Sequence, residues 1–117
     1  MKRRLALLAL FTAALFAQSA QTFLVVYKPG PKFIAGKPIA AQPLGEHGRY
    51  MMSLYQKGIL KIAGPFTDDA GGAVMFSAAT PADAKSIVEH DPAVINGIFS
   101  YDLHPWGLVD WQSRANK

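Results

Sequence analysis

Residues 44–58, LGEHGRYMMSLYQKG, form the stretch around which the rest of the fold is organised. Four of its residues recur at spacings of three, four and three: Leu44, His47, Met51 and Leu54. This spacing places them on one face of an α-helix. Gly58 ends the pattern, because glycine readily adopts the left-handed conformation of a helix cap. We therefore expect a helix over 44–57 whose core-facing side carries the imidazole of His47.

A histidine on a core-facing helix position has two interpretations. It can be a structural residue, hydrogen-bonded inside the core. It can also be a catalytic acid or base, because the imidazole is the side chain that changes charge near neutral pH without perturbation. A partner from elsewhere in the chain is needed to choose between them.

The N-terminus has the pattern of a secretory signal. Three basic residues precede an uncharged apolar run over 5–17, and small residues follow at the expected positions before a cleavage site after Ser19. We predict residues 1–19 as a signal peptide, residues 20–117 as a single domain, and a periplasmic or secreted protein. The run is shorter than the roughly 20 residues of a membrane span, so an uncleaved anchor is the weaker alternative.

Composition excludes several classes of protein. The chain of 117 residues has 50% hydrophobic and 17% charged residues, which is typical of a folded domain. Removal of residues 1–19 takes three of the twelve basic residues, so nine basic and eight acidic residues leave a net charge of +1. No basic stripe for nucleic acid remains, and we expect membrane contact only through the leader during export. There are no cysteines, which excludes disulfides and thiolate metal sites.

The remaining segments predict an α+β fold. Strands are expected at 22–27, 59–63, 73–78 and 98–103, and a second helix runs from the Thr80 cap and Pro81 to about His90. The order strand, helix, strand, strand, helix, strand gives a ferredoxin-like sandwich with both helices on one face of an antiparallel sheet. Residues 28–43 contain four prolines and form a long loop, which we interpret as a lid or a packed cover over a site.

The sheet also predicts a homodimer. The first and third strands are apolar at consecutive positions, in Leu24-Val25-Val26 and Val74-Met75-Phe76, so their second face is apolar as well. Large exposed apolar patches mark interfaces. We expect a second copy to cover this sheet face.

Topology brings Asp91 to His47. Asp91 continues the apolar stripe of the second helix, and the C-terminal end of that helix returns to the sheet edge where the first helix begins. We interpret Asp91 as lying at a helix C-terminus and His47 near a helix N-terminus, which opposes both helix dipoles. Such violations concentrate at functional sites. On this interpretation Asp91→Asn would leave stability unchanged or slightly raise it.

Other candidates have weaker patterns. His90 and His104 share no metal-like spacing with His47, so we expect no metal site. Gly64, Pro65 and Phe66 lie at the same sheet edge as His47, and together with Trp106 they are our candidate substrate-binding residues, although large aromatics are more often core residues.

The motifs EHGRYMMSLYQKGIL (46–60), GPFTDDAGG (64–72), EHDPAVINGIF (89–99) and HPW (104–106) together resemble the YCII-related (YciI-like) domain family. The resemblance implies a ferredoxin-like fold and dimers of the α/β-barrel type. It also implies a histidine and an aspartate as the active-site pair, which fall on His47 and Asp91. Some members of the family act in the breakdown of halogenated aromatics. The leader and the proline-rich loop depart from the family pattern.

Three functions remain open at the level of sequence. The first is a cofactor-independent acid–base enzyme, catalysing elimination or isomerisation of a small organic molecule with His47 as base and Asp91 as its orienting partner. The second is a non-catalytic dimeric module that binds a small ligand and uses the His–Asp pair structurally. A haem or metal binder using His47 is the third, and the sequence offers no supporting ligands for it.

Overall fold

The structure is a computed structural model that describes residues 19–117. The predicted leader, residues 1–19, lies outside this part except for Ser19, and its cleavage stays a prediction. The strands are β1 (Gln21–Pro29), β2 (Leu60–Pro65), β3 (Gly72–Ala78) and β4 (Phe99–Pro105). The helices are α2 (Gly45–Gln56), α3 (Pro81–Glu89) and the short η1 (Ile39–Ala41), α4 (Pro92–Ile95) and α5 (Trp111–Ala115). Within residues 19–117 no helix is long and apolar enough to cross a membrane.

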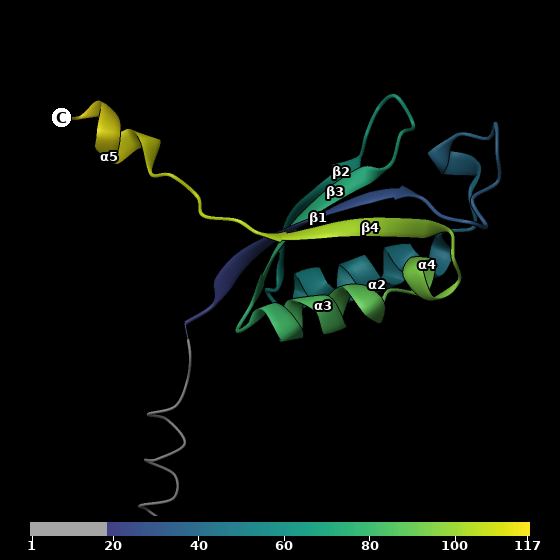
Figure 1. The fold of residues 1–117 in the computed structure, drawn as a ribbon, viewed down its shortest axis with the longest axis horizontal. Helices are drawn as coiled ribbons and strands as arrows, with labels where there is room; N and C mark the ends of the chain where they lie inside the picture. Colours follow the sequence, from purple (N-terminus) through teal and green to yellow (C-terminus); the bar gives the residue numbers. More distant parts are fainter. Residues whose placement is uncertain (1–18) are drawn as a thin grey trace, which may run out of the picture.

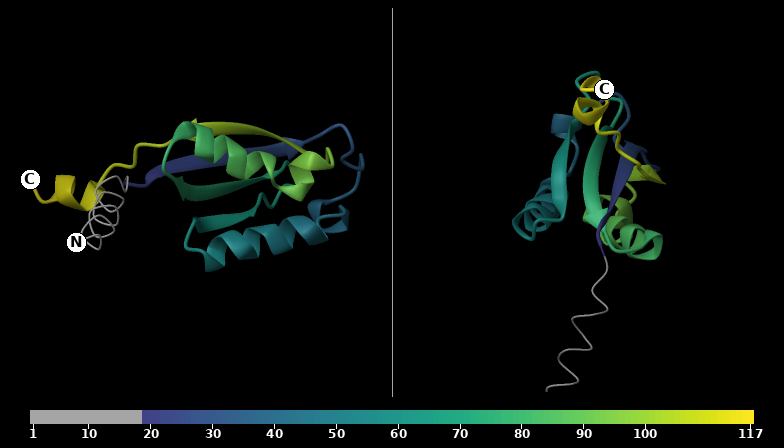
Figure 2. Two further views of the ribbon diagram at one scale, coloured as in Figure 1. Left: turned by 90° about the horizontal axis from the view of Figure 1, so that it is seen from below. Right: turned by 90° about the vertical axis from the view of Figure 1, so that its left-hand side faces the viewer.

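The four strands form one antiparallel sheet in the order β2-β3-β1-β4 (Figure 1). Helices α2 and α3 both lie along the same face of this sheet (Figures 1 and 2). This is the predicted ferredoxin-like arrangement, and the prediction of the fold class is confirmed. Both long helices also have the predicted ends: Thr80 Oγ1 accepts from the backbone N–H of Asp83 at 3.1 Å, and Gly58 adopts a φ of 77°.

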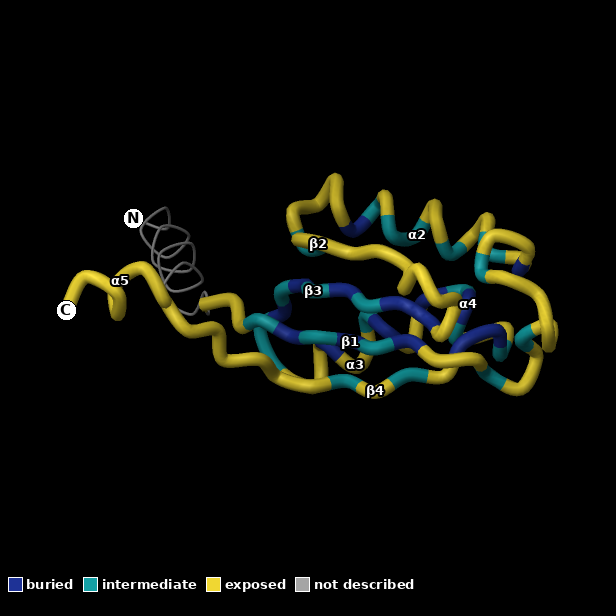
Figure 3. Tube along the Cα trace, turned by 90° about the horizontal axis from the view of Figure 1, so that it is seen from above, coloured by how far each residue is buried: buried dark blue, intermediate teal, exposed yellow. Residues whose placement is uncertain are grey.

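The core lies between the sheet and the helices. Alternate residues of β1 face the helices, and Phe23, Val25 and Tyr27 are buried. Phe23 stands directly opposite Phe76 of β3, with ring centroids 5.9 Å apart. Figure 3 shows the buried residues gathered along β1 and β3, in the middle of the sheet. Burial of large side chains on this face is the main stabilising contribution to the fold.

The opposite face of the sheet is apolar and only partly covered in a single chain. Leu24, Val26 and Met75 are half-buried there, and Ile62 is 64% exposed. The chain after β4 then runs away from the body and ends in α5, whose Trp111 is 70% exposed (Figure 1). The outer face of β1 and β3 is therefore only half-covered within one chain, and the homodimer stays a prediction.

Candidate active site

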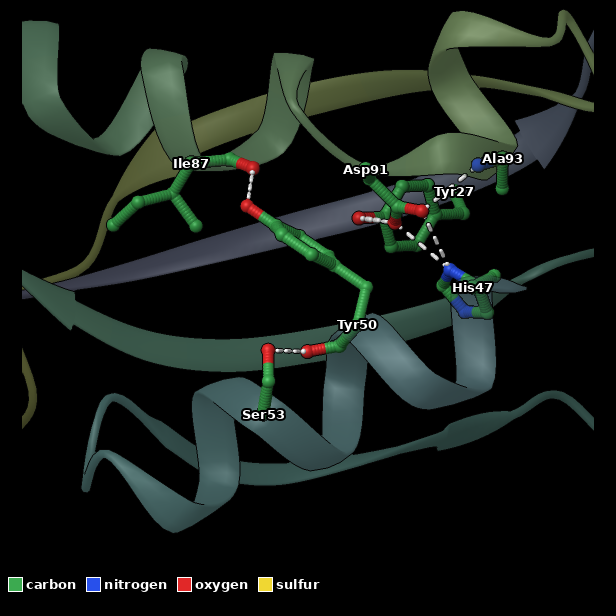
Figure 4. Close-up of polar contacts among 7 residues, drawn as sticks. All are labelled: Tyr27, His47, Tyr50, Ser53, Ile87, Asp91 and Ala93. Carbon is green, nitrogen blue, oxygen red and sulfur yellow. Dashed lines mark hydrogen bonds and ion pairs between the residues drawn. The ribbon is translucent and has the colours of Figure 1, made fainter. Parts of the chain in front are cut away.

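His47 and Asp91 are in direct contact. The Nδ1 atom of His47 lies 2.9 Å from Oδ1 and 2.8 Å from Oδ2 of Asp91 (Figure 4). His47 is the third residue of α2, and Asp91 lies in the turn between α3 and α4. The antiparallel return of α3 brings these residues together across 44 positions of sequence, as the topology predicts.

The side chain of Asp91 is completely buried, and both of its oxygens accept hydrogen bonds. Tyr27 donates its hydroxyl to Oδ2 at 2.8 Å, and the backbone N–H of Ala93 donates to Oδ1 at 2.9 Å (Figure 4). The carboxylate accepts both of these bonds and has lone pairs left for a third donor. We therefore assign a proton to Nδ1 of His47, which leaves Nε2 as the free ring nitrogen.

The Nε2 atom is accessible. It has no hydrogen-bond partner among the described residues, while every buried side-chain nitrogen and oxygen in that part of the chain is satisfied. The side chain of His47 is 18% exposed. The imidazole thus has one nitrogen fixed to Asp91 and one that can exchange protons with a ligand.

The helix-dipole interpretation is wrong for Asp91. Helix α3 ends at Glu89, and Asp91 is the N-cap of the separate helix α4, with its carboxylate capping the backbone of Ala93. A carboxylate is favourable at a helix N-terminus. The sequence predicts only that the second helix ends at about His90, but Pro92 begins a new helix, and proline is common at the first helical position.

Tyr27 is a site residue that the sequence analysis missed. Burial, the negative charge of Asp91 and the hydrogen bond to that carboxylate, in this order, raise the pKa of Tyr27 far above its ordinary value. The hydroxyl is therefore a permanent donor to Asp91. A signal was present, because a tyrosine on the buried face of a strand requires a hydrogen-bond partner for its hydroxyl.

Aromatic rings hold the imidazole in place. The ring of His47 meets both Tyr27 and Phe99 edge to face, with centroids 5.6 Å apart in each case. Tyr27 and Phe99 also pack on one another at 5.2 Å. These contacts and the Asp91 bond fix the orientation of the ring, as required of a positioned acid or base.

Tyr50 joins the two long helices near this pair. Its hydroxyl donates to the backbone carbonyl of Ile87 at 2.6 Å (Figure 4). Burial, and to a smaller extent the charge of Asp91, raises the pKa of Tyr50. This bond fixes α2 against α3, and so holds His47 at its distance from Asp91.

A pocket of about 240 Å³ opens beside the imidazole. His47, Gly48 and Met51 of α2 line one wall, and the β2–β3 hairpin lines the other, including Gly64 and Pro65. The lining is mostly apolar, which is typical of a site for a small organic ligand. Gly64 and Pro65 therefore lie where the sequence analysis places them.

Phe66 and Trp106 are not part of this pocket. Phe66 follows β2 and is 37% exposed, outside the pocket wall. Trp106 lies beside Leu24, Ile62 and Met75, on the sheet face opposite the helices. The sequence predicts that Trp106 follows the last strand, but it does not predict on which face of the sheet the Trp106 side chain lies.

The proline-rich loop covers the pocket. Ile39 lines it, and the backbone N–H of Ile39 donates to Oδ1 of Asp69 in the β2–β3 turn at 3.1 Å. Gln42 is buried and makes three hydrogen bonds to the backbone of Ile34 and Lys37. The loop is therefore a packed cover, one of the two alternatives that its length predicts.

Within residues 19–117 the side chains of the other two histidines form no hydrogen bond to His47 or Asp91. His90 is exposed and its Nδ1 contacts the backbone oxygen of Ser86, and His104 is exposed on β4. Within the described range of the chain, no three His, Cys, Asp or Glu side chains gather as metal ligands do.

This fold and site define a small ferredoxin-like α+β domain with a His–Asp–Tyr cluster, centred on a buried carboxylate, beside a small apolar pocket. The model of the YCII-related domain family matches residues 22–107, and the chain belongs to this family. The resemblance inferred from the sequence motifs is confirmed.

A solved structure with the same fold is 5-chloro-2-hydroxyhydroquinone dehydrochlorinase from Burkholderia phenoliruptrix AC1100, in complex with 2,5-dihydroxybenzoquinone. The two proteins are 22% identical with a TM-score of 0.57, over 77% of this chain and 97% of the dehydrochlorinase chain. At this identity the likeness shows the fold alone. No functionally curated protein matches the sequence.

Proposed function

We propose that the protein is an exported, dimeric enzyme that moves a proton on a small organic molecule without a cofactor, in an elimination or an isomerisation. One observation carries this proposal. Asp91 holds Nδ1 of His47 at 2.8 Å, while Nε2 has no partner among the described residues and the imidazole lines an apolar pocket. A base with this orientation, next to a space for a ligand, is suited to general acid–base catalysis.

The reaction begins with transfer of a proton from an acidic C–H or O–H group of the ligand to Nε2 of His47. The carboxylate of Asp91 stabilises the resulting imidazolium, and Tyr27 and the backbone of Ala93 hold that carboxylate in place. In an elimination the released electron pair expels a leaving group. In an isomerisation it shifts a double bond, and the imidazolium returns the proton to a different atom.

The pocket favours a ligand with a single ring. An apolar cavity of about 150 Å³ binds benzene, and the pocket beside His47 has about 240 Å³. A hydroxylated six-membered ring would fit this volume. The dehydrochlorinase of the same fold acts on a compound of this kind, which supports the proposal for this chain.

The alternative function is a non-catalytic dimeric module that binds a small ligand. The capping role of Asp91 favours it, because Tyr27 and Ala93 satisfy the carboxylate even without His47. In that case the His–Asp contact contributes to packing of α2 against the α3–α4 turn, and the pocket binds its ligand without changing it.

Two further parts of the proposal concern assembly and location. The half-buried apolar face of the sheet supports a homodimer in which a second copy covers Leu24, Val26 and Met75. The leader supports export to the periplasm or the medium, with cleavage near Ser19. Intact-mass measurement of protein from its native host tests the export, and a mass that includes residues 1–17 would contradict it.

Chloride release from 5-chloro-2-hydroxyhydroquinone tests the chemistry. We expect release with the wild-type protein and a loss of at least about a hundredfold in His47→Gln, the usual contribution of a general base. Exchange of ring C–H protons of 2,5-dihydroxybenzoquinone in D₂O, followed by NMR, detects proton transfer without a leaving group. Binding of the quinone with no exchange and no chloride release would favour the binding module.

A further inference from the structure

Gly48 lies inside helix α2 without a backbone reason to be glycine. Its φ is not in the left-handed region, and a Cβ atom built there would meet no atom within 4 Å. Glycine in a helix interior destabilises the helix relative to alanine, because it loses more conformational freedom on folding. Gly48 therefore destabilises the helix, and no contact around it explains why the residue is glycine.

Gly48 lines the pocket beside His47, and it also borders a second hollow with Met52 and Tyr55. Leu44, Gly48 and Met51 follow one another at helical spacing, and all three line the pocket next to His47. A methyl group at position 48 would therefore reduce the space along this wall of the pocket.

Two other glycines of the pocket wall, Gly71 and Gly72, are different, whereas a Cβ atom built at Gly64 would, as at Gly48, meet no atom within 4 Å. A Cβ at Gly71 would clash with the backbone oxygen of Tyr27, and Gly71 has a φ of 144°. A Cβ at Gly72 would approach the backbone oxygen of Gly64 to 2.8 Å. Close approach of the hairpin backbone thus explains Gly71 and Gly72, but not Gly48.

We propose that Gly48 is a specificity-determining residue, whose missing side chain leaves room for a substituent on the ring of the ligand. This inference rests on the proposed function, because it concerns the ligand of the same site. A methyl group takes up roughly the volume of one water molecule, about 30 Å³, against about 240 Å³ for the whole pocket. Alanine at position 48 would therefore remove space for a substituent and still leave space for an unsubstituted ring.

The experiment compares the wild type with Gly48→Ala and with the control Gly45→Ala. Gly45 is the first residue of the same helix and does not line the pocket of about 240 Å³, although it borders a separate hollow on which His47 also lies. Its Cβ would make only an ordinary contact of 3.9 Å with Arg49. The probes are hydroquinone, methylhydroquinone and tert-butylhydroquinone, kept reduced, with dissociation constants measured by calorimetry. Thermal melts of all three proteins accompany the titrations.

In Gly48→Ala we expect affinity for tert-butylhydroquinone to fall by about tenfold or more, the size of a discrimination by one or two methyl groups. Affinity for hydroquinone, which has no substituent to occupy this space, should stay within about twofold. The melting temperature should rise, because alanine is the better helix residue. Gly45→Ala should keep the wild-type order of affinities.

Two outcomes overturn this inference alone: equal relative affinities of wild type and Gly48→Ala for the three compounds, or a lower melting temperature of Gly48→Ala. The second would show that Gly48 has a local structural role. If the wild-type protein binds none of the three rings, both this inference and the proposed ligand class are contradicted.

Discussion

Tyr27 donates its hydroxyl to Oδ2 of Asp91 across 2.8 Å, and this bond connects the central strand β1 to the turn between α3 and α4. The carboxylate that orients His47 is therefore also a junction of the core. The orientation of the His47 ring and the stability of the fold depend on the same buried carboxylate, so each substitution there requires measurements of both folding and function.

Tyr27→Phe tests this junction. The variant keeps the ring but removes a buried hydrogen bond to a charged acceptor, which contributes about 1.5–3 kcal/mol. We expect the free energy of unfolding to fall by about this amount in denaturant melts at pH 7. Tyr55→Phe is the control, because Tyr55 is 62% exposed, and should change stability little. A loss no larger than in the control would contradict the role of the Tyr27 bond.

The raised pKa of Tyr27 also predicts a dependence on alkaline pH. The folded state holds the phenol proton more tightly than the unfolded state, whose tyrosine pKa is about 10. The stability from this group is therefore complete below about pH 10 and decreases as the pH rises further. Melts between pH 8 and pH 11 should show a steeper loss for wild type than for Tyr27→Phe. Parallel curves for the two proteins would contradict this assignment.

Asp91→Asn should destabilise the protein, contrary to what the dipole interpretation predicts. Asparagine can still cap α4. Its amide N–H₂ group, however, would lie next to the groups that now donate hydrogen bonds to the carboxylate, and two donors cannot bond to each other. We expect a loss of about 1–3 kcal/mol, and a smaller loss for His47→Gln, because Tyr27 and Ala93 then still satisfy the carboxylate. If Asp91→Asn is as stable as wild type in denaturant melts, the buried carboxylate is not the junction that its contacts indicate.

Asp69 should control how tightly the loop covers the pocket. Its carboxylate accepts from the backbone of Ile39, and its φ of 64° is one that aspartate and asparagine tolerate better than other residues. We expect Asp69→Ala to release a bound dihydroxybenzoquinone several-fold faster in stopped-flow measurements, and Asp69→Asn to behave like wild type. Asp68→Ala is the neighbouring control, since Asp68 bonds only within the turn. Equal release rates for all three variants and the wild type would show that the bond between Asp69 and the loop does not slow release of the ligand.

A charged residue on the outer sheet face should break the proposed dimer. Met75 lies in the middle of the apolar face, opposite Leu24, whereas Ser100 lies on the polar part of β4. In light scattering we expect Met75→Glu to have half the mass of wild type with an unchanged circular dichroism spectrum, and Ser100→Glu to remain dimeric. A wild-type protein that is monomeric at micromolar concentration would contradict the dimer.

The sequence by itself determined the order of the four strands and the two long helices and placed their ends to within two residues. The hydrophobic period over 44–58, the Thr80-Pro81 helix start and the left-handed Gly58 are local signals, because they depend on residues within one or two helical turns. The approach of Asp91 to His47 was also predictable, since an antiparallel helix return leaves few places for its end. These features follow from chain direction and local propensity.

Only the tertiary structure decided how the site is completed. Tyr27 reaches Asp91 across 64 positions of sequence, and Trp106 turns to the sheet face opposite His47. No local pattern encodes these contacts, because they depend on how β1, α2 and the α3–α4 turn pack in three dimensions. Packing likewise made Asp91 the N-cap of a new helix, since α4 packs against α2 and β4 instead of continuing α3.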